Sequence, residues 1–412
     1  MGVLDGVRVI DLSQGAAGPI CAMTLGDHGA EVVKVEPCDG EWGRALGPPF
    51  VGEVAASYIG MNRNKRSLAI DLKRPQGVEV VRRLVQRSDV LVESFRPGVV
   101  ERLGLGYEEL IAANPRLVYC SINAFGPSGP WRDKPGVDGV VQAMSGLMSV
   151  TGLDGAEPVK VGVPAADVTA AAHAVQGLLL GLLARVQTGR GQRVSVSLLD
   201  AMLAFQTVPL TMYLASGEPP KRLGSAAAYS APNEAYRTMD GAIMVAAYTP
   251  ARWAGLCQIL ERPDLLEDAR FRANADRVAN RSELRVELER TLRRRATDEW
   301  IALLEAADIL CAPLYDYPSL LAQPQVMEND MLVRVPHPVL GETATVGIPV
   351  KLTELPGSVR AGAPLVGEHS ATILSEAGYG VEEIHQLIAT GTVAARDVGA
   401  VEEEVQAGAV GS

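Results

Sequence analysis

One aspartate has the sequence surroundings of a reactive carboxylate. Asp167 follows the segment 162–166 (GVPAA) and is an isolated acid in an apolar setting where a long helix starts. Free backbone amides and the helix dipole stabilise a carboxylate at such a position as an anion. Taken alone, the residue type and position are more typical of a helix N-cap than of a nucleophile. One carboxylate can serve as both.

Two groups of basic residues could bind phosphate. Arg63, Lys65 and Arg66 form the first group, and Arg96 and Arg102 form the second. The net charge of the chain is −11, so an anionic ligand has to be held by such a local cluster against the overall field. Arg can bind phosphate oxygens in pairs, and Lys acts as a point charge. For each residue taken singly, an ordinary solvated surface charge is the simpler interpretation.

Composition excludes several classes of protein. The acidic balance argues against a general nucleic-acid binder. The five cysteines are odd in number, form no CxxC pair and follow no secretory signal, which favours a reduced, cytoplasmic protein. The five histidines show no metal-ligand spacing, so we expect no metal site. The apolar stretch 168–183 contains His173 and falls short of the ~20 residues of a membrane span; we expect a buried helix, a core histidine and no membrane contact.

The elements that must position these residues alternate between strands and helices. Residues 7–12 predict a strand, 13–19 a Gly/Ala-rich turn, 20–27 a helix and 31–35 a second strand. Such a β-turn-α-β unit implies parallel pairing and an α/β layer fold. The turn lacks the GxGxxG pattern, which argues against NAD, although its helix N-terminus could hold an anion.

Chain length predicts more than one domain. Single hydrophobic cores stop growing near ~250–300 residues, and this chain has 412. Composition shifts near Arg222, where amphipathic helices rich in Arg and Glu begin, and we interpret that region as a smaller domain. The acidic, Gly/Ala-rich tail from residue 397 to 412 predicts a flexible end.

A series of segments, in order from about residue 4 to about residue 390, resembles the family III CoA-transferases of the CaiB/BaiF type, to which formyl-CoA transferase belongs. The matching segments are 4–12, 26–37, 64–67, 93–98, 134–138, 142–143, 145–148, 165–167, 188–192 and 367–369. No single segment is decisive, but the ordered series is very specific.

The resemblance implies an α/β fold made of two interlocked rings, one per subunit of a homodimer. A large Rossmann-like domain would be built from residues 1–221 and, returning to it, residues 323–396. A smaller α+β domain, residues 222–322, would be inserted between them.

The resemblance also implies an activity, the transfer of CoA from an acyl-CoA donor to a carboxylic acid. Asp167 would form an acyl-aspartyl anhydride and then an aspartyl-CoA thioester. An aspartate of ordinary pKa, near ~4, is already ionised at neutral pH. CoA and acyl-CoA would be substrates, with no permanently bound cofactor. The matched positions near CoA are Ala16, Ala17, Lys65, Arg66, Phe95, Arg96, Arg102 and Asp138.

Two departures and two alternatives remain. Ser94 replaces the usual Asn of a Glu-Asn-Phe segment, and the stretch 224–232 is Ala-rich where some members have a mobile glycine-rich loop. A 2-methylacyl-CoA racemase shares the fold but needs a second base, and a silent CoA-binding protein would use Asp167 only as a cap. Arg44 or Arg237 could meet a second carboxylate of the acid, with a solvated Arg as the simpler interpretation of each.

Overall fold

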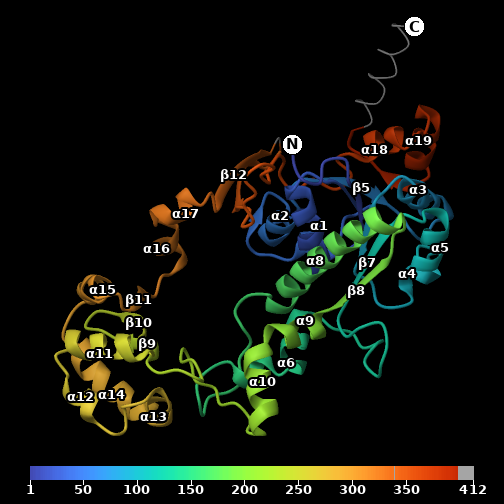
Figure 1. The fold of residues 1–412 in the computed structure, drawn as a ribbon. Helices are drawn as coiled ribbons and strands as arrows, with labels where there is room; N and C mark the ends of the chain where they lie inside the picture. The colour runs from blue at the N-terminus through green and yellow to red at the C-terminus, as the bar shows by residue number, and fades with distance from the viewer. Residues whose placement is uncertain (338, 398–412) are drawn as a thin grey trace. The chain divides into compact units, whose positions relative to one another are not determined.

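The computed structural model describes residues 1–337 and 339–397 (Figure 1). These residues separate into two compact units. The first comprises residues 1–145 and 161–207 and the described residues from 325 onward, and the second comprises 146–160 and 208–324. The expected domain boundaries after residues 221 and 322 remain a prediction. The expected flexible tail lies, beyond Asp397, outside the described residues.

A seven-stranded sheet organises the described part of the first unit. In spatial order its strands are β14 (Val393–Ala394), β5 (Lys65–Ile70), β2 (Glu31–Glu36), β1 (Arg8–Asp11), β6 (Val90–Glu93), β7 (Val118–Asn123) and β8 (Arg193–Ser197). All neighbouring pairs are parallel except β14 with β5. Residues from both ends of the chain therefore build one mixed α/β layer with a mainly parallel sheet.

The strand order predicts where a ligand would bind. Counted along the chain, the six parallel strands lie in the order third, second, first, fourth, fifth and sixth, as in doubly wound nucleotide-binding folds. The order reverses between β1 and β6. In open sheets of this kind, ligands bind outside the carboxyl ends of the strands at this reversal point.

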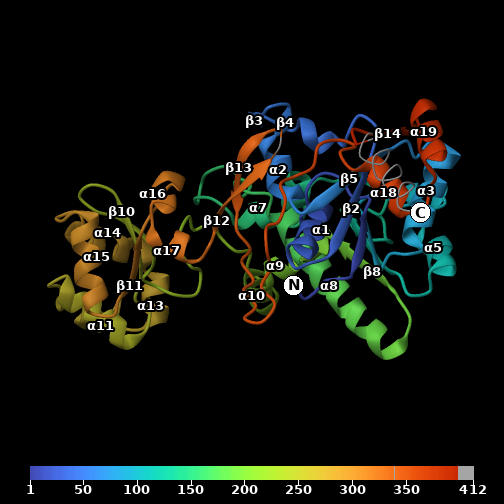
Figure 2. The same cartoon turned by 90° about the horizontal axis from the view of Figure 1, so that it is seen from above.

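One face of the sheet is covered by α3 (Pro75–Val85), α5 (Tyr107–Ala113), α18 (Ser370–Glu376) and α19 (Val381–Ala389) (Figure 2). Val80 and Val81 of α3 and Leu374 of α18 pack with strand residues such as Leu68 and Leu91 in one buried cluster. In the middle of the sheet, β6 is an apolar run from Val90 to Val92 because both of its faces are buried, whereas β8 at the edge alternates between exposed and half-buried residues over most of its length.

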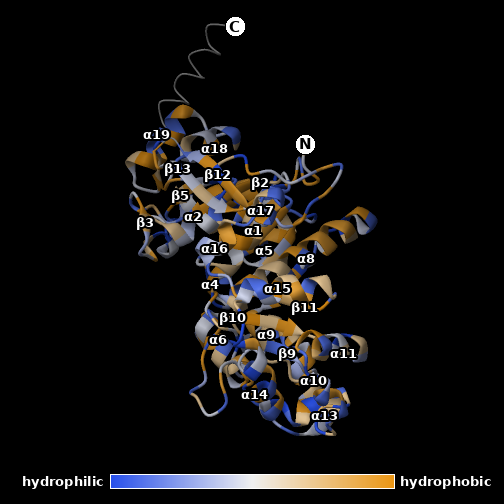
Figure 3. Cartoon of the chain, turned by 90° about the vertical axis from the view of Figure 1, so that its left-hand side faces the viewer, coloured by the Kyte–Doolittle hydropathy of each residue, from blue (hydrophilic) through white to orange (hydrophobic). Residues whose placement is uncertain are grey.

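The other face carries α1 (Ala17–Asp27) and α8 (Ala165–Thr188), which pack against each other. Small residues let α8 approach the sheet closely: a Cβ added at Gly177 would lie 2.5 Å from Val194, and one at Gly181 would lie 2.7 Å from Val118. The other side of α8 is apolar yet exposed, including Leu180, so the expectation of a buried helix is wrong there (Figure 3).

Among the described helices, α8 is the single helix that is both long enough and apolar enough to cross a membrane. The bent pair α9 and α10, taken together as one segment, is also long and apolar enough. The expectation of no membrane contact therefore remains a prediction. His173 of α8 is half-buried and hydrogen-bonds Gln176 of the same helix at 3.0 Å, so it is not the core histidine that we expected.

The remaining described elements of the first unit flank the sheet. They are η1 (Trp42–Ala45), β3 (Phe50–Val51), β4 (Val54–Ala55), α2 (Ala56–Asn62), α4 (Val99–Arg102), α6 (Asp138–Met144), α9 (Leu198–Phe205), β12 (Leu332–His337) and β13 (Gly341–Val346). Two further helices, α10 (Thr207–Ser216) and α17 (Pro324–Glu328), run across the boundaries between the units.

The second unit has its own core. Three antiparallel strands, β9 (Asn233–Arg237), β10 (Ala242–Ala246) and β11 (Leu310–Pro313), form its sheet. Its helices are α7 (Leu147–Val150), α11 (Pro250–Ile259), α12 (Asp264–Glu267), α13 (Asn274–Ala279), α14 (Arg281–Leu292), α15 (Thr297–Ala306) and α16 (Tyr317–Leu321). Tyr236, Trp253, Phe271 and Trp300 are buried together.

Candidate active site

Asp167 lies in the first turn of α8, and its side chain is free. The helix begins at Ala165 with Pro164 as the N-cap residue, so Asp167 is the third helical residue and not the cap. Within the described part of the chain its carboxyl group accepts no hydrogen bond. Burial, reinforced by the negative charge of Asp138, raises the pKa of Asp167 to about 7. The ordinary carboxyl pKa of about 4, which holds for an unperturbed aspartate, therefore does not apply to Asp167.

Asp138 occupies the amides that Asp167 could have used. Its Oδ1 accepts hydrogen bonds from the backbone N–H of Ala166 at 2.8 Å and of Asp167 at 3.4 Å. Its Oδ2 accepts one from Nε2 of Gln142 at 2.7 Å. The sequence suggested Asp138 as a residue near CoA. In the structure, the Asp138 carboxylate, which belongs to α6, instead caps the N-terminus of α8.

The start of α8 lies at the carboxyl-end edge of the sheet. At the other end of the helix, Gly191 donates to Pro115 O at 2.9 Å and Arg116 donates to Gly189 O at 3.3 Å. Pro115 and Arg116 immediately precede the amino end of β7. Because the helix crosses the sheet between these edges, Asp167 lies on the side where the strand order predicts a ligand.

The turn after β1 reaches the same edge. Gly18 has to be glycine because an added Cβ would lie 2.2 Å from Ser13 Cβ. Ala16 is the N-cap of α1 and Ala17 its first residue, which corrects the expected helix start at Ile20. Among the described residues, none accepts a hydrogen bond from the backbone N–H of Ala17 or Gly18. Both expected CoA positions, Ala16 and Ala17, are therefore at a helix N-terminus with free N–H groups.

Ser94 joins the loops after β1 and β6, where the strand order reverses. Its Oγ accepts a hydrogen bond from Gln14 N at 3.0 Å and donates to Gln14 O at 3.3 Å. The Ser at this position, a departure from the family pattern, thus ties the two loops directly.

Phe95, Arg96 and Arg102 follow β6 at this edge. Phe95 packs against the core and its N–H donates to Glu93 Oε2 at 2.8 Å. Burial raises the pKa of Glu93 to about 7. Arg96 and Arg102 are exposed, and neither side chain forms an ion pair or hydrogen bond with any described residue. Two unpaired guanidinium groups at the ligand edge suit phosphate oxygens.

Lys65, by contrast, is enclosed. Its fully buried ammonium donates to Asp11 Oδ2, Pro19 O and Asn62 Oδ1, each at 2.8 Å. An ammonium has three donors, and all three are used. Burial lowers the pKa of Lys65 to about 8, with Asp11 opposing the shift. The expectation that Lys65 meets CoA is not supported, since a phosphate could reach it only if this network opened.

The network supports the turn after β1. Lys34, also fully buried, pairs with Glu41 Oε1 at 2.8 Å and donates to Ser13 O at 3.1 Å. Glu41 in turn accepts from the N–H of Gly15 at 2.8 Å. The sequence reasoning missed Lys34 and Glu41, because nothing in their spacing shows that a buried cation and anion meet under a turn.

We expect the Lys65→Met variant to lose about 3–5 kcal/mol of unfolding free energy, because the change leaves Asp11 buried without its nearest cation. Denaturant unfolding measures this loss. The Arg96→Ala variant is the control: it should keep wild-type stability and bind CoA about tenfold more weakly, the loss of one charged hydrogen bond. A Lys65→Met protein of normal stability with weakened CoA binding would contradict the structural role.

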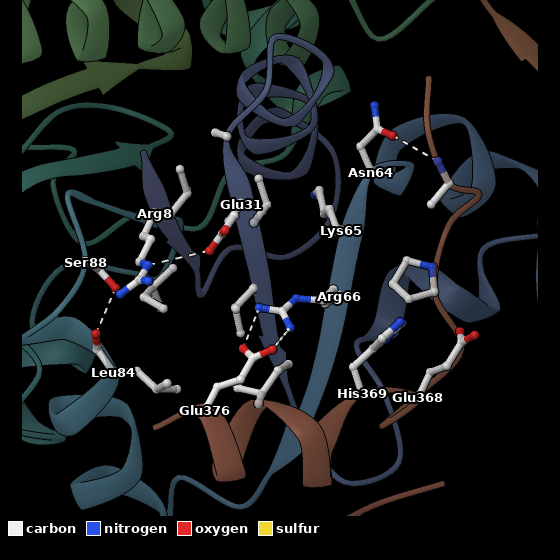
Figure 4. Close-up of a pocket in the computed structure, with 18 of the residues that line it drawn as sticks. Arg8, Glu31, Asn64, Lys65, Arg66, Leu84, Ser88, Glu368, His369 and Glu376 are labelled. Atoms are coloured by element: carbon white, nitrogen blue, oxygen red, sulfur yellow. Dashed lines mark hydrogen bonds and ion pairs between the residues drawn. The ribbon is translucent and has the colours of Figure 1, made fainter. Parts of the chain in front are cut away.

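Arg66 lies at the opposite edge of the sheet. It forms two hydrogen bonds with Glu376 of α18, at 2.7 and 2.9 Å (Figure 4). Both residues line a cavity of about 870 Å³ beside the amino ends of β1, β2 and β5, where Arg8 pairs with Glu31. None of the residues that surround Asp167 lines this cavity. Arg66 is therefore not brought together with Phe95, Arg96 and Arg102.

Arg44 is neither solvated nor available to a substrate. Its guanidinium pairs with Glu36 at 2.6 and 2.7 Å and donates to Tyr58 Oη at 2.6 Å and Pro364 O at 2.9 Å. Burial opposes the charge, but Glu36, Tyr58 and Glu41 together outweigh burial and raise the pKa of Arg44. This excludes Arg44 as the partner of a second carboxylate. Arg237, in the second unit, is exposed.

Comparison with known proteins identifies the family. A model of CoA-transferase family III matches residues 4–370. Human succinyl-CoA:glutarate CoA-transferase is 36% identical over 95% of this chain and 90% of its own length. Acetyl-CoA:oxalate CoA-transferase of Acetobacter aceti is 34% identical over 91% of this chain and 96% of its own.

A solved structure agrees. A CaiB/BaiF family protein from Brucella suis is 35% identical and superimposes with a TM-score of 0.82 over 91% of this chain and 99% of that one. The fold, the matched family model and these relatives lead to one conclusion: the chain belongs to CoA-transferase family III and is a CoA-transferase.

Proposed function

We propose that this enzyme transfers CoA from an acyl-CoA donor to a carboxylic acid through covalent intermediates on Asp167. One observation carries the proposal: the Asp167 carboxylate is unbonded at the ligand edge of the sheet, while a neighbouring carboxylate satisfies the helix amides around it. A carboxylate in this state has the lone pairs of both oxygens available for attack.

The steps balance without an oxidant or reductant. An Asp167 oxygen attacks the thioester carbonyl of the donor, and the C–S bond breaks to give an acyl-aspartyl anhydride and CoA thiolate. The thiolate attacks the aspartyl carbonyl, releases the donor acid as its carboxylate and leaves an aspartyl-CoA thioester. The acceptor carboxylate attacks this thioester and frees the thiolate again. In the last step the thiolate takes the acceptor acyl group and regenerates Asp167.

Several free groups support a CoA site at this edge. Arg96 and Arg102 carry unpaired charge, and no described residue accepts a hydrogen bond from the backbone N–H of Ala17 or Gly18. Free amides at a helix N-terminus attract anions. In a chain of net charge −11, these local groups would hold the CoA phosphates against the overall field.

We propose a dicarboxylic acid as the acceptor and succinyl-CoA as the donor. The basis is the names of relatives: succinyl-CoA:glutarate CoA-transferase in human, succinate–glutarate CoA-transferase in Agrobacterium fabrum and succinyl-CoA:mesaconate CoA-transferase in Haloarcula hispanica. All of these names specify a dicarboxylate. The cytoplasmic location and the lack of a permanently bound cofactor remain predictions from the sequence.

The racemase alternative is not favoured. The relatives are named as CoA-transferases, and a racemase needs a second base beside the first. His173 lies six residues beyond Asp167, roughly 9 Å along the helix axis and on another side of it. Proton exchange at the α-carbon of a 2-methylacyl-CoA in deuterated water, without an acceptor acid, would revive this alternative.

The proposal is tested by trapping the intermediate. Incubation with succinyl-CoA, without acceptor, followed by mass spectrometry of the digested protein, should give a CoA adduct on the peptide containing Asp167. Adding glutarate should discharge it and yield glutaryl-CoA. Turnover with no adduct on this peptide at any donor concentration would contradict the covalent mechanism.

We also propose that the enzyme is a homodimer, with the large Rossmann-like domain and the interlocked rings that the family resemblance implies. The exposed apolar residues of α8 support it, since monomers rarely leave such a contiguous patch uncovered. They are Leu179, Leu180, Leu183 and Val186.

We expect the double variant Leu180→Asp, Leu183→Asp to shift the protein from dimer to monomer in light scattering, because two charges would be buried at the interface. The Val286→Asp change, at an exposed apolar position of α14, is the control and should leave the mass unchanged. A wild-type protein that is monomeric at micromolar concentration would contradict the dimer.

A further inference from the structure

Gln142 is a fully buried amide that joins three parts of the site. Its Nε2 donates to Asp138 Oδ2 at 2.7 Å and to Val163 O at 3.2 Å, and its Oε1 accepts from Val161 N at 2.9 Å. Both amide hydrogens and the oxygen are thus in use. Asp138 and Gln142 lie four residues apart on α6, so that their side chains meet on one face of the helix.

The amides at the start of α8 are all accounted for. Ala165 N donates to Val163 O at 2.8 Å and Val168 N to Pro164 O at 3.0 Å. Ala166 N and Asp167 N donate to Asp138 Oδ1. In a capping box, the side chain of the third helical residue, here Asp167, accepts a hydrogen bond from the backbone N–H of the N-cap residue. Pro164 is the N-cap residue and has no N–H, so this bond cannot form. No local donor is left for the Asp167 carboxylate.

This arrangement depends on where Asp138 is held. If Asp138 moved away, the N–H groups of Ala166 and Asp167 would be free, and the Asp167 side chain could turn back onto them. A carboxylate bonded to its own helix amides is stabilised as an anion and is a weaker, misdirected nucleophile. Gln142 fixes Asp138 Oδ2 and also the chain at Val161 and Val163, which leads into α8.

We infer that Gln142 is a positioning residue for the nucleophile: by holding Asp138 against the first turn of α8, it keeps the Asp167 carboxylate unbonded and directed away from its own helix. The expected effect of Gln142 on kcat rests on the proposed covalent function. Its expected effect on the hydrogen bonding of Asp167 does not. Gln142 itself touches no reacting atom.

The amide cannot be exchanged for a carboxylate of the same shape. In a Gln142→Glu variant, an ionised oxygen would replace Nε2 at 2.7 Å from Asp138 Oδ2, where two like charges repel. Protonation of the introduced carboxyl group would restore a donor. The variant therefore carries its own pH signature: its activity relative to wild type should rise as the pH falls.

The first experiment compares this variant with a matched control, Gln206→Glu. Gln206 is also a buried glutamine and donates to Ser145 O and Met202 O, at 3.1 and 3.0 Å, without contact to the start of α8. We expect the Gln142→Glu change to lower kcat about 100-fold at pH 8, with the KM for succinyl-CoA changed less than threefold. Gln206→Glu should lower stability similarly but leave kcat and its pH profile unchanged.

A second experiment needs no turnover. The stability change caused by Asp167→Asn is measured as a function of pH in the wild-type and Gln142→Leu backgrounds. In the wild type the Asn variant should gain stability between pH 4 and pH 7. In the Gln142→Leu background this gain should vanish, because Asp167 would then be stabilised as an anion by the released amides.

The outcomes separate the two ideas. If no transfer or adduct is found but the stability gain depends on Gln142, the proposed function fails and the positioning role stands. If transfer proceeds through Asp167 but Gln142→Glu behaves like Gln206→Glu in kcat and pH profile, the positioning role is overturned. A stability gain that is identical in both backgrounds would overturn it as well.

Discussion

Replacing Asp167 by alanine or asparagine should reduce CoA transfer by a factor on the order of 10⁴ or more, the scale of loss seen when an enzyme loses its nucleophile. The binding of CoA should change less than threefold, because the groups proposed to hold the phosphates lie on other segments. Steady-state kinetics and calorimetric titration with CoA measure the two effects. Retention of more than a few per cent of wild-type turnover by the Ala variant would contradict a covalent role.

The Asp167→Asn change, which should remove activity, should at the same time raise the free energy of unfolding at pH 8. The folded-state pKa of Asp167, about 7, exceeds its unfolded value near 3.8. Between these values the folded state binds more protons than the unfolded state, so the wild type loses stability as the pH rises. Asp167→Asn removes this cost, and the variant should be more stable than wild type at pH 8 and equal to it below pH 4. A protein made less stable at pH 8 would indicate that Asp167 is a structural cap.

The pH dependence of transfer should show the largest effect after loss of the nucleophile. Because only the ionised form of Asp167 attacks, kcat/KM should fall roughly 50-fold from pH 7 to pH 5, approaching a tenfold fall for each pH unit well below the pKa. The initial rate at low succinyl-CoA concentration measures kcat/KM. A profile that is flat from pH 8 to pH 5 would contradict the raised pKa.

The contribution of Asp138 to the pH dependence of kcat/KM can be tested by substitution. The elements packed against α8 carry the ionisable residues Cys21, Asp27, Tyr119, Cys120, Asp138, Arg193 and Asp200. After burial itself, Asp138 is the residue that raises the pKa of Asp167. Asp138→Asn keeps an oxygen for the Ala166 amide, removes the charge and takes away the acceptor of Gln142 Nε2; the last two changes both favour an ionised Asp167, so the acid limb should move to lower pH. An unmoved limb would assign the raised pKa to burial alone.

The sequence predicted the layer fold and, through the family resemblance, singled out Asp167 as the proposed nucleophile. The apolar run 7–12, followed by a Gly/Ala-rich turn, a helix and a second strand over 31–35, predicted parallel strands and covering helices, because a β-turn-α-β unit pairs its strands in parallel. Local patterns were less reliable at element ends. The helix expected from Ile20 begins at Ala17, and the strand expected over 7–12 spans Arg8–Asp11.

The tertiary structure alone decided which charges are free. Lys65, Arg66 and Arg96 are similar in the sequence, yet one is enclosed by three acceptors, one is paired across the opposite edge of the sheet, and one is unpaired beside the ligand edge. The same holds for Asp167, whose freedom to react depends on a cap contributed by Asp138 from 29 residues away. Residue type fixes what a side chain can bond, but its partners come from segments that only folding brings together. This is why the family resemblance could point to Asp167 as the proposed nucleophile, whereas the environment of its side chain could not be read from the sequence.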